Sequence, residues 1–217
     1  MSPIRSTPRT LAALAACLLA TGLWQIGEGS WIYAKARLAQ WLLQRAWTRT
    51  LDGGSPVKPW PWADTWPVAR LSVPSLQINQ IVLNGAYGRT LAFGPGYAES
   101  SSFPGSSGTT IFTGHRDTHF RFLRELREGD EIVVASAKGG RRNYRVVGRQ
   151  IVKAETAAIA LGEQDDRLIL ITCYPFDAIV PGGPLRYVVT AVATTKEASG
   201  AIGETFASVS ISRGEQG

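Results

Sequence analysis

Residues 169–175 have the sequence ILITCYP, an apolar and β-branched run of strand length that ends on a thiol. A run of this kind predicts a buried strand. The proline two residues after Cys173 cannot donate a hydrogen bond to a strand ladder, so we expect the strand to end near the thiol. A side chain at the mouth of a strand is open to a substrate, which makes Cys173 a candidate nucleophile.

Short predicted strands lie on both sides of this run. Gly139 and Gly140 predict a hairpin turn between two of them, and residues 120–127 predict a helix. Seven or so strands at this spacing indicate a mainly β fold that closes, or nearly closes, into a barrel. The predicted strands are apolar or alternating runs bounded by Gly, Pro, Asn or Asp, at residues 68–73, 77–83, 109–113, 131–135, 144–152, 168–172 and 187–193.

The composition is that of a globular protein. A chain of 217 residues suffices for one well-buried domain with attachments. The hydrophobic fraction of 44% and the charged fraction of 18% exclude wholesale disorder. The net charge of +6 comes from scattered Arg and Lys residues without a basic stripe, which argues against a nucleic-acid partner. A mildly basic surface suits a negatively charged membrane or wall polymer.

The N-terminal region has the features of a membrane anchor. Arg5 and Arg9 precede residues 11–26, LAALAACLLATGLWQI, which are almost wholly apolar. We expect an uncleaved, single-pass anchor over residues 1–30, with its N-terminus in the cytoplasm and the remaining chain on the outer face of the cell membrane. As an alternative, residues 14–17 resemble a lipoprotein cleavage box, which would make Cys17 a lipidated N-terminus.

Residues 31–66 predict a juxtamembrane unit. In residues 31–50 the apolar side chains recur at helical spacing, and the basic side chains lie mostly on the other positions, which predicts an amphipathic helix. Residues 52–67 are rich in Gly and Pro and predict a linker. Indole is enriched at lipid–water boundaries, so we expect the helix to lie along the lipid, the alternative being that it packs on the domain. The small, polar residues 196–217 predict a flexible tail. All seven tryptophans precede residue 67: Trp24, Trp31, Trp41, Trp47, Trp60, Trp62 and Trp66.

The cysteine count favours a functional thiol. Cys17 and Cys173 are the two cysteines of the chain, so a disulfide framework is excluded. An unpaired thiol in an oxidising compartment indicates a nucleophile, whereas the alternative is a small buried hydrophobe. Such a nucleophile needs a proton partner near neutral pH. His115, which begins the loop after the strand at 109–113, is the first candidate, and His119 competes with it.

The same residues could instead bind zinc. His115 and His119 are spaced by four residues, and Asp117 and Cys173 could complete a ligand set. Against this, Arg116 stands where the helix of a zinc protease would carry its catalytic glutamate, and His115 follows a strand. We therefore expect no metal and no cofactor.

Arg186 is the candidate cation. It follows Cys173 by thirteen residues, at the start of the strand at 187–193, and the loop between them is stiffened by Pro and Gly. Two neighbouring strand ends would present the thiol and the guanidinium to the same point. A fixed cation there can lower the pKa of a thiol or stabilise an oxyanion. The alternative is a surface arginine at a strand start.

Three segments, in order along about residues 69–193, resemble the sortases, a family of bacterial membrane-anchored Cys transpeptidases. They are RLSVPSLQINQIVLNG, LAFGPGYAESSSFPGSSGTTIFTGHRDT and RLILITCYPFDAIVPGGPLRYVVT. The family signature Thr-Leu-x-Thr-Cys is matched by Leu170, Thr172 and Cys173, with Ile169 in place of the first Thr. The motifs are most similar to classes D and E, and the Trp-rich anchor resembles the proteobacterial group called class GN.

This resemblance implies a closed eight-stranded β-barrel over residues 67–195. It also implies that Cys173 is the nucleophile, His115 the general acid and base, and Arg186 the group that holds the substrate backbone or the oxyanion. His119 matches no catalytic position of the family. The residues expected to contact the substrate are Thr113, Thr172 and Tyr174.

The resemblance implies a reaction as well. Sortases cut a sorting motif of the Leu-Pro-x-Thr-Gly type, hold a thioacyl intermediate on cysteine and pass it to an amine. The expected partners are a secreted protein with a C-terminal sorting signal, an amine acceptor in the cell wall or envelope, and membrane lipid through the anchor. Two alternatives stay open. One is a Cys hydrolase that uses water, and the other is a membrane-tethered β-barrel that binds without catalysis.

Overall fold

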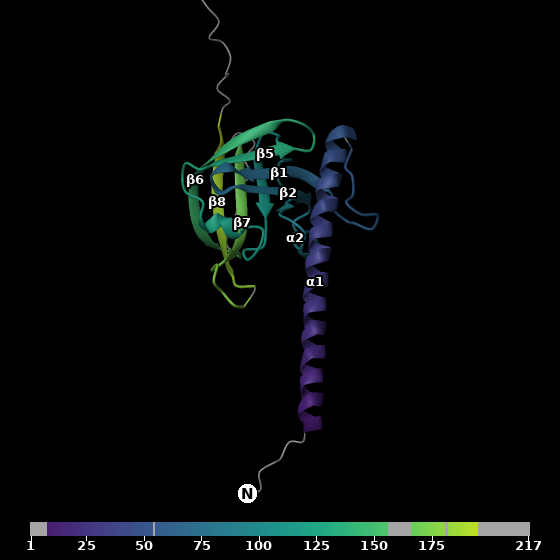
Figure 1. The fold of residues 1–217 in the computed structure, drawn as a ribbon. Coiled ribbons are helices and arrows are strands. Elements are labelled where there is room, and N and C mark those ends of the chain that lie inside the picture. Colours follow the sequence, from purple (N-terminus) through teal and green to yellow (C-terminus); the bar gives the residue numbers. More distant parts are fainter. Residues whose placement is uncertain (1–7, 54, 156–165, 181, 195–217) are drawn as a thin grey trace, which may run out of the picture.

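Eight strands close into a β-barrel with a long helix at its side (Figure 1). The computed structural model describes residues 8–53, 55–155, 166–180 and 182–194. The strand order around the barrel is β1-β2-β3-β4-β7-β8-β6-β5, in which β2/β3 and β4/β7 are parallel. The closed eight-stranded barrel expected from the sequence is thus confirmed. Its strands are β1 (Pro67–Val73), β2 (Ile78–Asn84), β3 (Gly96–Tyr97), β4 (Thr109–Thr113), β5 (Glu131–Ser136), β6 (Arg141–Lys153), β7 (Arg167–Tyr174) and β8 (Leu185–Ala193).

The seven predicted strands are all present, with shifts at their ends. β7 continues through Cys173 to Tyr174, whose partner in β8 is Leu185, so the thiol lies one residue before the end of the ladder. Gly139 and Gly140 turn the chain between β5 and β6 with φ angles of 88° and 89°, in the left-handed region that favours glycine. β3 has only two residues, too few to produce a sequence pattern.

The helix predicted over residues 120–127 is wrong. That segment contains one turn of 3₁₀ helix, η2 (Arg121–Arg124), beside the similarly short η1 (Pro74–Leu76) and α2 (Gly88–Leu91). Phe120, Phe122 and Leu123 are all buried. In an α-helix the first two would point to nearly opposite sides, so burying both in one core favours an irregular turn.

The two faces of β7 have different surroundings. Leu168 and Leu170 point into the main core, where each fully buried leucine contributes about 1.5–3 kcal/mol. Ile169 belongs to a second apolar cluster with Ile111 and Val188. Because side chains alternate along a strand, Cys173 shares the face of Ile169 and lies on the outside of the barrel.

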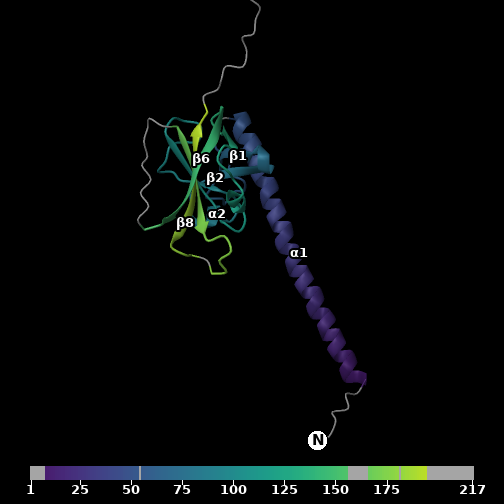
Figure 2. The same ribbon diagram turned by 90° about the vertical axis from the view of Figure 1, so that its left-hand side faces the viewer.

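One continuous helix, α1 (Pro8–Gly53, 46 residues), spans both the expected anchor and the expected juxtamembrane helix. Its C-terminal part packs on β1 and β2 through the buried Leu43, Ala46 and Trp47. The alternative that this segment packs on the domain therefore describes its last turns. The N-terminal part projects away from the barrel in two perpendicular views (Figures 1 and 2). It is long and apolar enough to cross a membrane. The predicted tail at 196–217 lies outside the described residues.

Candidate active site

Strands β7 and β8 place Cys173 opposite Arg186. The two residues are Cα partners in the antiparallel ladder. Directly opposed side chains share one face of a sheet, with Cβ atoms about 4.5–5.5 Å apart. Cys173 is a free thiol and is half-buried. The structure thus places Cys173 and Arg186, which the sequence predicted to meet, opposite each other on neighbouring strands.

Strand β4 brings His115 to the same level. β4 runs parallel to β7, and the last Cα partners of this ladder are Thr113 and Ile171. The Gly114 N–H donates to the Ile171 carbonyl at 3.2 Å, which continues the register by one step. His115 and Cys173 each lie two residues beyond the last pair. His115, Cys173 and Arg186 therefore lie at the same level at one end of the adjacent strands β4, β7 and β8, and His115 is exposed.

The guanidinium of Arg186 is held by the loop that precedes it. Its Nη1 donates to the carbonyl oxygens of Gly183 and Leu185 at 2.6 and 2.8 Å. An arginine has five N–H donors, so within the described residues these two bonds leave donors available to a ligand. The guanidinium of Arg186 is thus held in place at the start of β8, on the residue paired with Cys173.

The hydroxyl of Thr172 ties β7 to the residue before His115. Its Oγ1 donates to the Gly114 carbonyl at 2.7 Å, and Thr172 is only 2% exposed. The sequence predicted that Thr172 contacts the substrate. The structure gives its hydroxyl a partner inside the protein, so its place in the site is to hold the His115 turn against β7.

The other two predicted substrate contacts lie on different faces. Thr113 is half-buried two residues before His115, and its hydroxyl is buried without a hydrogen-bond partner among the described residues. Tyr174 points away from the Cys173 face. It stacks on Tyr187 at 6.2 Å between ring centroids and meets the edge of Phe176 at 6.2 Å. Phe176 and Tyr187 of this aromatic group pack against the main core.

Arg116 is a residue of the site that sequence reasoning missed. It is 5% exposed, and its guanidinium reaches the β7/β8 loop. Nη1 donates to the Pro175 carbonyl at 2.7 Å, and Nη2 donates to the carbonyls of Ala178 and Val180. Its Nε also lies 3.3 Å from the exposed Asp117 carboxylate. The bonds to the loop span some sixty positions in the sequence, so no local pattern could indicate them.

His119 lies apart from this group. It is half-buried, and its backbone carbonyl accepts a hydrogen bond from Gln80 at 2.8 Å. Burial lowers the pKa of His119, a hydrogen bond with the Ala92 backbone opposes this, and the charge of His115 lowers the pKa further. Among the described residues, no three or more His, Cys, Asp or Glu side chains gather closely enough to hold a metal ion.

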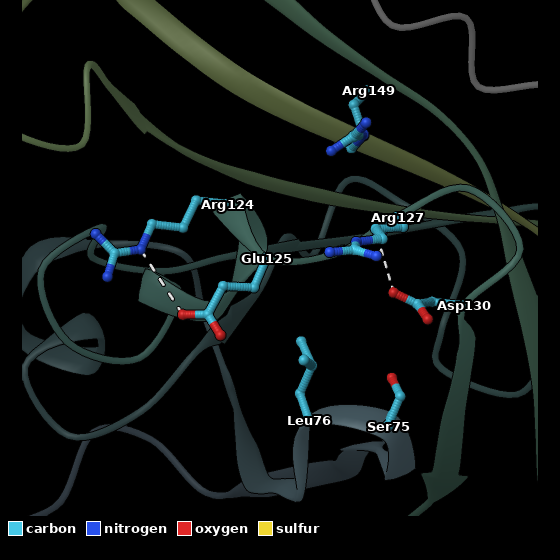
Figure 3. Close-up of a pocket in the computed structure, with 7 residues that line it drawn as sticks. All are labelled: Ser75, Leu76, Arg124, Glu125, Arg127, Asp130 and Arg149. Carbon is cyan, nitrogen blue, oxygen red and sulfur yellow. Dashed lines mark hydrogen bonds and ion pairs between the residues drawn. The ribbon is translucent and has the colours of Figure 1, made fainter.

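An open cleft of about 540 Å³ on another part of the surface is not this site (Figure 3). Four of its five charged side chains already have partners within the fold. Arg124 pairs with Glu125 at 3.7 Å, the Asp130 carboxylate accepts from the Arg127 backbone N–H, and Arg149 donates to a backbone carbonyl. The residues that line it come from η1, η2, β6 and the turn before β5: Ser75, Leu76, Arg124, Glu125, Arg127, Asp130 and Arg149.

Comparisons with known proteins match this fold. The family model for the sortase domain matches residues 71–194. Sortase D of Bacillus subtilis (strain 168) is 34% identical over 120 residues, which cover 55% of this chain and 60% of that protein. The chain thus spans less than two thirds of the length of this relative.

Two solved structures are similar over the barrel. Sortase A from Corynebacterium diphtheriae has a TM-score of 0.56 and 25% identity, over 64% of this chain and 66% of that chain. Sortase C-1 from Actinomyces oris has a TM-score of 0.53 and 30% identity, over 59% and 73%. With a family match over more than half of its residues, the chain belongs to the sortase family.

Proposed function

We propose that the protein is a cysteine transpeptidase that attaches secreted proteins to an amine acceptor in the cell envelope. The observation that carries this proposal is the meeting of His115, Cys173 and Arg186 at one level of three adjacent strands. The likeness to Sortase D supports a class D-like enzyme. The similarity to class E and to class GN stays a prediction from the motifs and the Trp-rich N-terminal region.

The three side chains have complementary roles in this reaction. The Cys173 thiolate attacks the scissile carbonyl and forms a thioester, while the peptide C–N bond breaks and the leaving amine takes a proton from His115. An acceptor amine then attacks the thioester and gives a proton to His115, and the C–S bond breaks to release the thiolate. The remaining N–H groups of Arg186 would stabilise the negative charge on the carbonyl oxygen, a role that its pairing with Cys173 supports.

The face around Cys173 suits an apolar, extended peptide. Ile171 is half-buried two residues before the thiol, and it packs beside the cluster of Ile111, Ile169 and Val188. This surface supports a sorting motif with apolar residues ahead of the cleaved bond, of the Leu-Pro-x-Thr-Gly type that the motifs imply.

The N-terminal part of α1 is the proposed anchor. It would cross the cell membrane once, with the N-terminus in the cytoplasm and the barrel on the outer face. The support is its apolar composition and the exposure of its large side chains from Leu11 to Leu38. The mass of the mature N-terminus tests this against the lipoprotein alternative, because lipidation at Cys17 would remove the residues before it.

The proposal is tested with the full chain in detergent and a Leu-Pro-x-Thr-Gly peptide. We expect a thioester adduct on Cys173 by mass spectrometry and, with an added primary amine, an amide product. Cys173→Ala should lose both, and the matched Cys17→Ala variant should retain both because Cys17 lies in α1. An unmodified Cys173 with full activity in Cys173→Ala would refute the proposal. A carboxylic acid product at high amine concentration would favour the hydrolase instead.

A further inference from the structure

The β7/β8 loop, which joins the strands of Cys173 and Arg186, carries two highly exposed aliphatic side chains. Ile179 is 98% exposed and Val180 is 76% exposed. They follow Cys173 by six and seven residues. Scattered apolar residues are common on protein surfaces. Two adjacent ones on the loop that follows the proposed nucleophile are a surface that a partner could cover.

Arg116 holds this tip in place. Its Nη2 donates to the carbonyls of Ala178 and Val180, which flank Ile179, and its Nη1 donates to the Pro175 carbonyl. Arg116 is 5% exposed, so these charge-assisted bonds are shielded from water. Turning the tip inward would break them. The outward position of Ile179 is therefore a property of the folded loop.

The tip and the projecting part of α1 emerge from the same end of the barrel. Both views show the β7/β8 loop on the side towards which the N-terminal part of the helix extends (Figures 1 and 2). No apolar partner from elsewhere in the described chain covers the tip, given the exposure of Ile179 and Val180. What lies on that side of the barrel would thus meet both the helix and the loop.

Side chains of α1 indicate where a lipid boundary would lie. The Lys35 ammonium sits over the Trp31 ring at 4.8 Å, and the Arg37 guanidinium over the Tyr33 ring at 5.2 Å. Such aromatic and basic residues are enriched at membrane–water interfaces. Gln40 still contacts the barrel, through the Phe93 carbonyl. From Gln40 to Trp31 the helix advances by only about 14 Å along its axis. The β7/β8 loop is long enough to extend from the barrel over that distance and so to reach the level of Trp31.

We propose that Ile179 and Val180 dip into the outer surface of the membrane that holds α1, so that the active site opens directly above the lipid. This inference rests on the proposed anchoring. Lipid is favoured over a protein partner because the loop lies at the end of the barrel from which α1 projects, where the aromatic and basic residues of α1 would mark the membrane surface. Arg116 directly follows His115 in the chain, and its guanidinium binds the loop that carries Ile179 and Val180. The side chain of Arg116 therefore links the proposed lipid contact to the proposed base.

The test is a depth measurement on the full chain in phosphatidylcholine–phosphatidylglycerol vesicles. A nitroxide label is attached at Ile179→Cys in a Cys17→Ala, Cys173→Ala background. Collision rates with lipid-soluble oxygen and with a water-soluble nickel chelate are compared by electron paramagnetic resonance. We expect the oxygen-to-nickel ratio to be several-fold higher than at Ser107→Cys, an exposed control just before β4 and hence at the opposite end of the barrel.

A third label, at Leu18→Cys in α1, separates the possible failures. Lipid exposure at both Leu18 and Ile179 supports the inference. Exposure at Leu18 alone overturns it and leaves the anchor standing, whereas exposure at neither position overturns the anchor and with it the inference. Protection of Ile179 only when sorting-motif peptide is added, or only at high protein density, assigns the tip to substrate or to a second copy and also overturns it.

Discussion

The hydroxyl of Thr172 joins the two segments that carry the proposed nucleophile and base. It comes from the residue before Cys173 and binds the carbonyl of the residue before His115. No larger side chain fits at Gly114, because a Cβ there would approach the Phe120 ring to 2.7 Å. Catalysis by a thiol and an imidazole depends on their mutual placement. A buried hydroxyl and a tightly packed glycine supply that placement here.

Replacing Thr172 with valine tests this role. The Thr172→Val side chain keeps the shape but leaves the Gly114 carbonyl buried and unpaired, which costs about 1–3 kcal/mol. We expect a lower free energy of unfolding in urea and a lower kcat with the sorting-motif peptide, and Thr172→Ser should restore both. A rise in KM alone, with stability unchanged, would instead support the substrate contact predicted from the sequence.

His119 should make stability depend on pH. Burial lowers its folded-state pKa below the ordinary value of 6.5. The unfolded chain therefore binds the proton more readily, so the free energy of unfolding falls as the pH drops below about 6.5 towards the folded-state pKa. Above about pH 6.5, His119 is neutral in both the folded and the unfolded chain, and this loss of stability is absent. In His119→Gln, urea unfolding from about pH 8 to pH 5 should show a smaller loss. An identical slope in both proteins would contradict the assignment.

At the scale of elements, the docking of α1 on the barrel is a packing interaction. Leu43 is 1% exposed and packs with Trp47 against Ile81 and Leu83 of β2. Arg70 of β1 also lies over the Trp47 ring at 5.6 Å. The helix is therefore attached to the domain by its own apolar side chains as well as through the linker.

Leu43→Ala should measure the strength of this attachment. Truncation of a buried leucine costs about 2–5 kcal/mol. We expect that loss in the free energy of unfolding of the full chain in detergent. The matched control, Arg49→Ala, changes an exposed residue of the same helix and should stay within about 0.5 kcal/mol of the parent. Equal stability of the two variants would show that α1 does not support the barrel.

The elements show which parts of the fold local sequence can predict. The strands were predictable because alternation and β-branching are local signals. The helix at residues 120–127 was not, because the burial of Phe120 and Phe122 is decided by the core. The apolar face of residues 31–50 was visible in the sequence, but a face pattern does not tell whether lipid or protein covers it. The role of Arg116 could not be predicted for a similar reason, since the carbonyls that it binds are distant in the sequence.

On the scale of the whole molecule, the length of α1 would fix the height of the barrel above the membrane that the proposed anchor crosses. Inserting seven residues between Tyr33 and Ala34 adds about two helical turns, keeps the docking face in register and raises the barrel by about 10 Å. We expect slower cleavage of a substrate anchored in the same vesicle and unchanged cleavage of a soluble peptide. Equal losses on both substrates would indicate a folding defect, and an unchanged ratio would show that height is irrelevant.

At the scale of the whole molecule, too, some features could be predicted from the sequence and others could not. The family and the closed barrel were predictable because three motifs occur in order along the chain. The level at which His115, Cys173 and Arg186 meet depends on the β4/β7 and β7/β8 registers, which no single segment encodes. The sequence could therefore name these three residues, whereas their alignment became visible only in the folded chain.

The unbroken course of α1 has a kinetic consequence. A helix without a hinge between its apolar part and its docked part would let the barrel spin about the bilayer normal but not tumble. Encounters with a sorting signal would then be collisions within a plane. Their frequency would follow the surface density and lateral diffusion of the two proteins, and a substrate that left the bilayer would lose this two-dimensional advantage and react only in proportion to its concentration in solution.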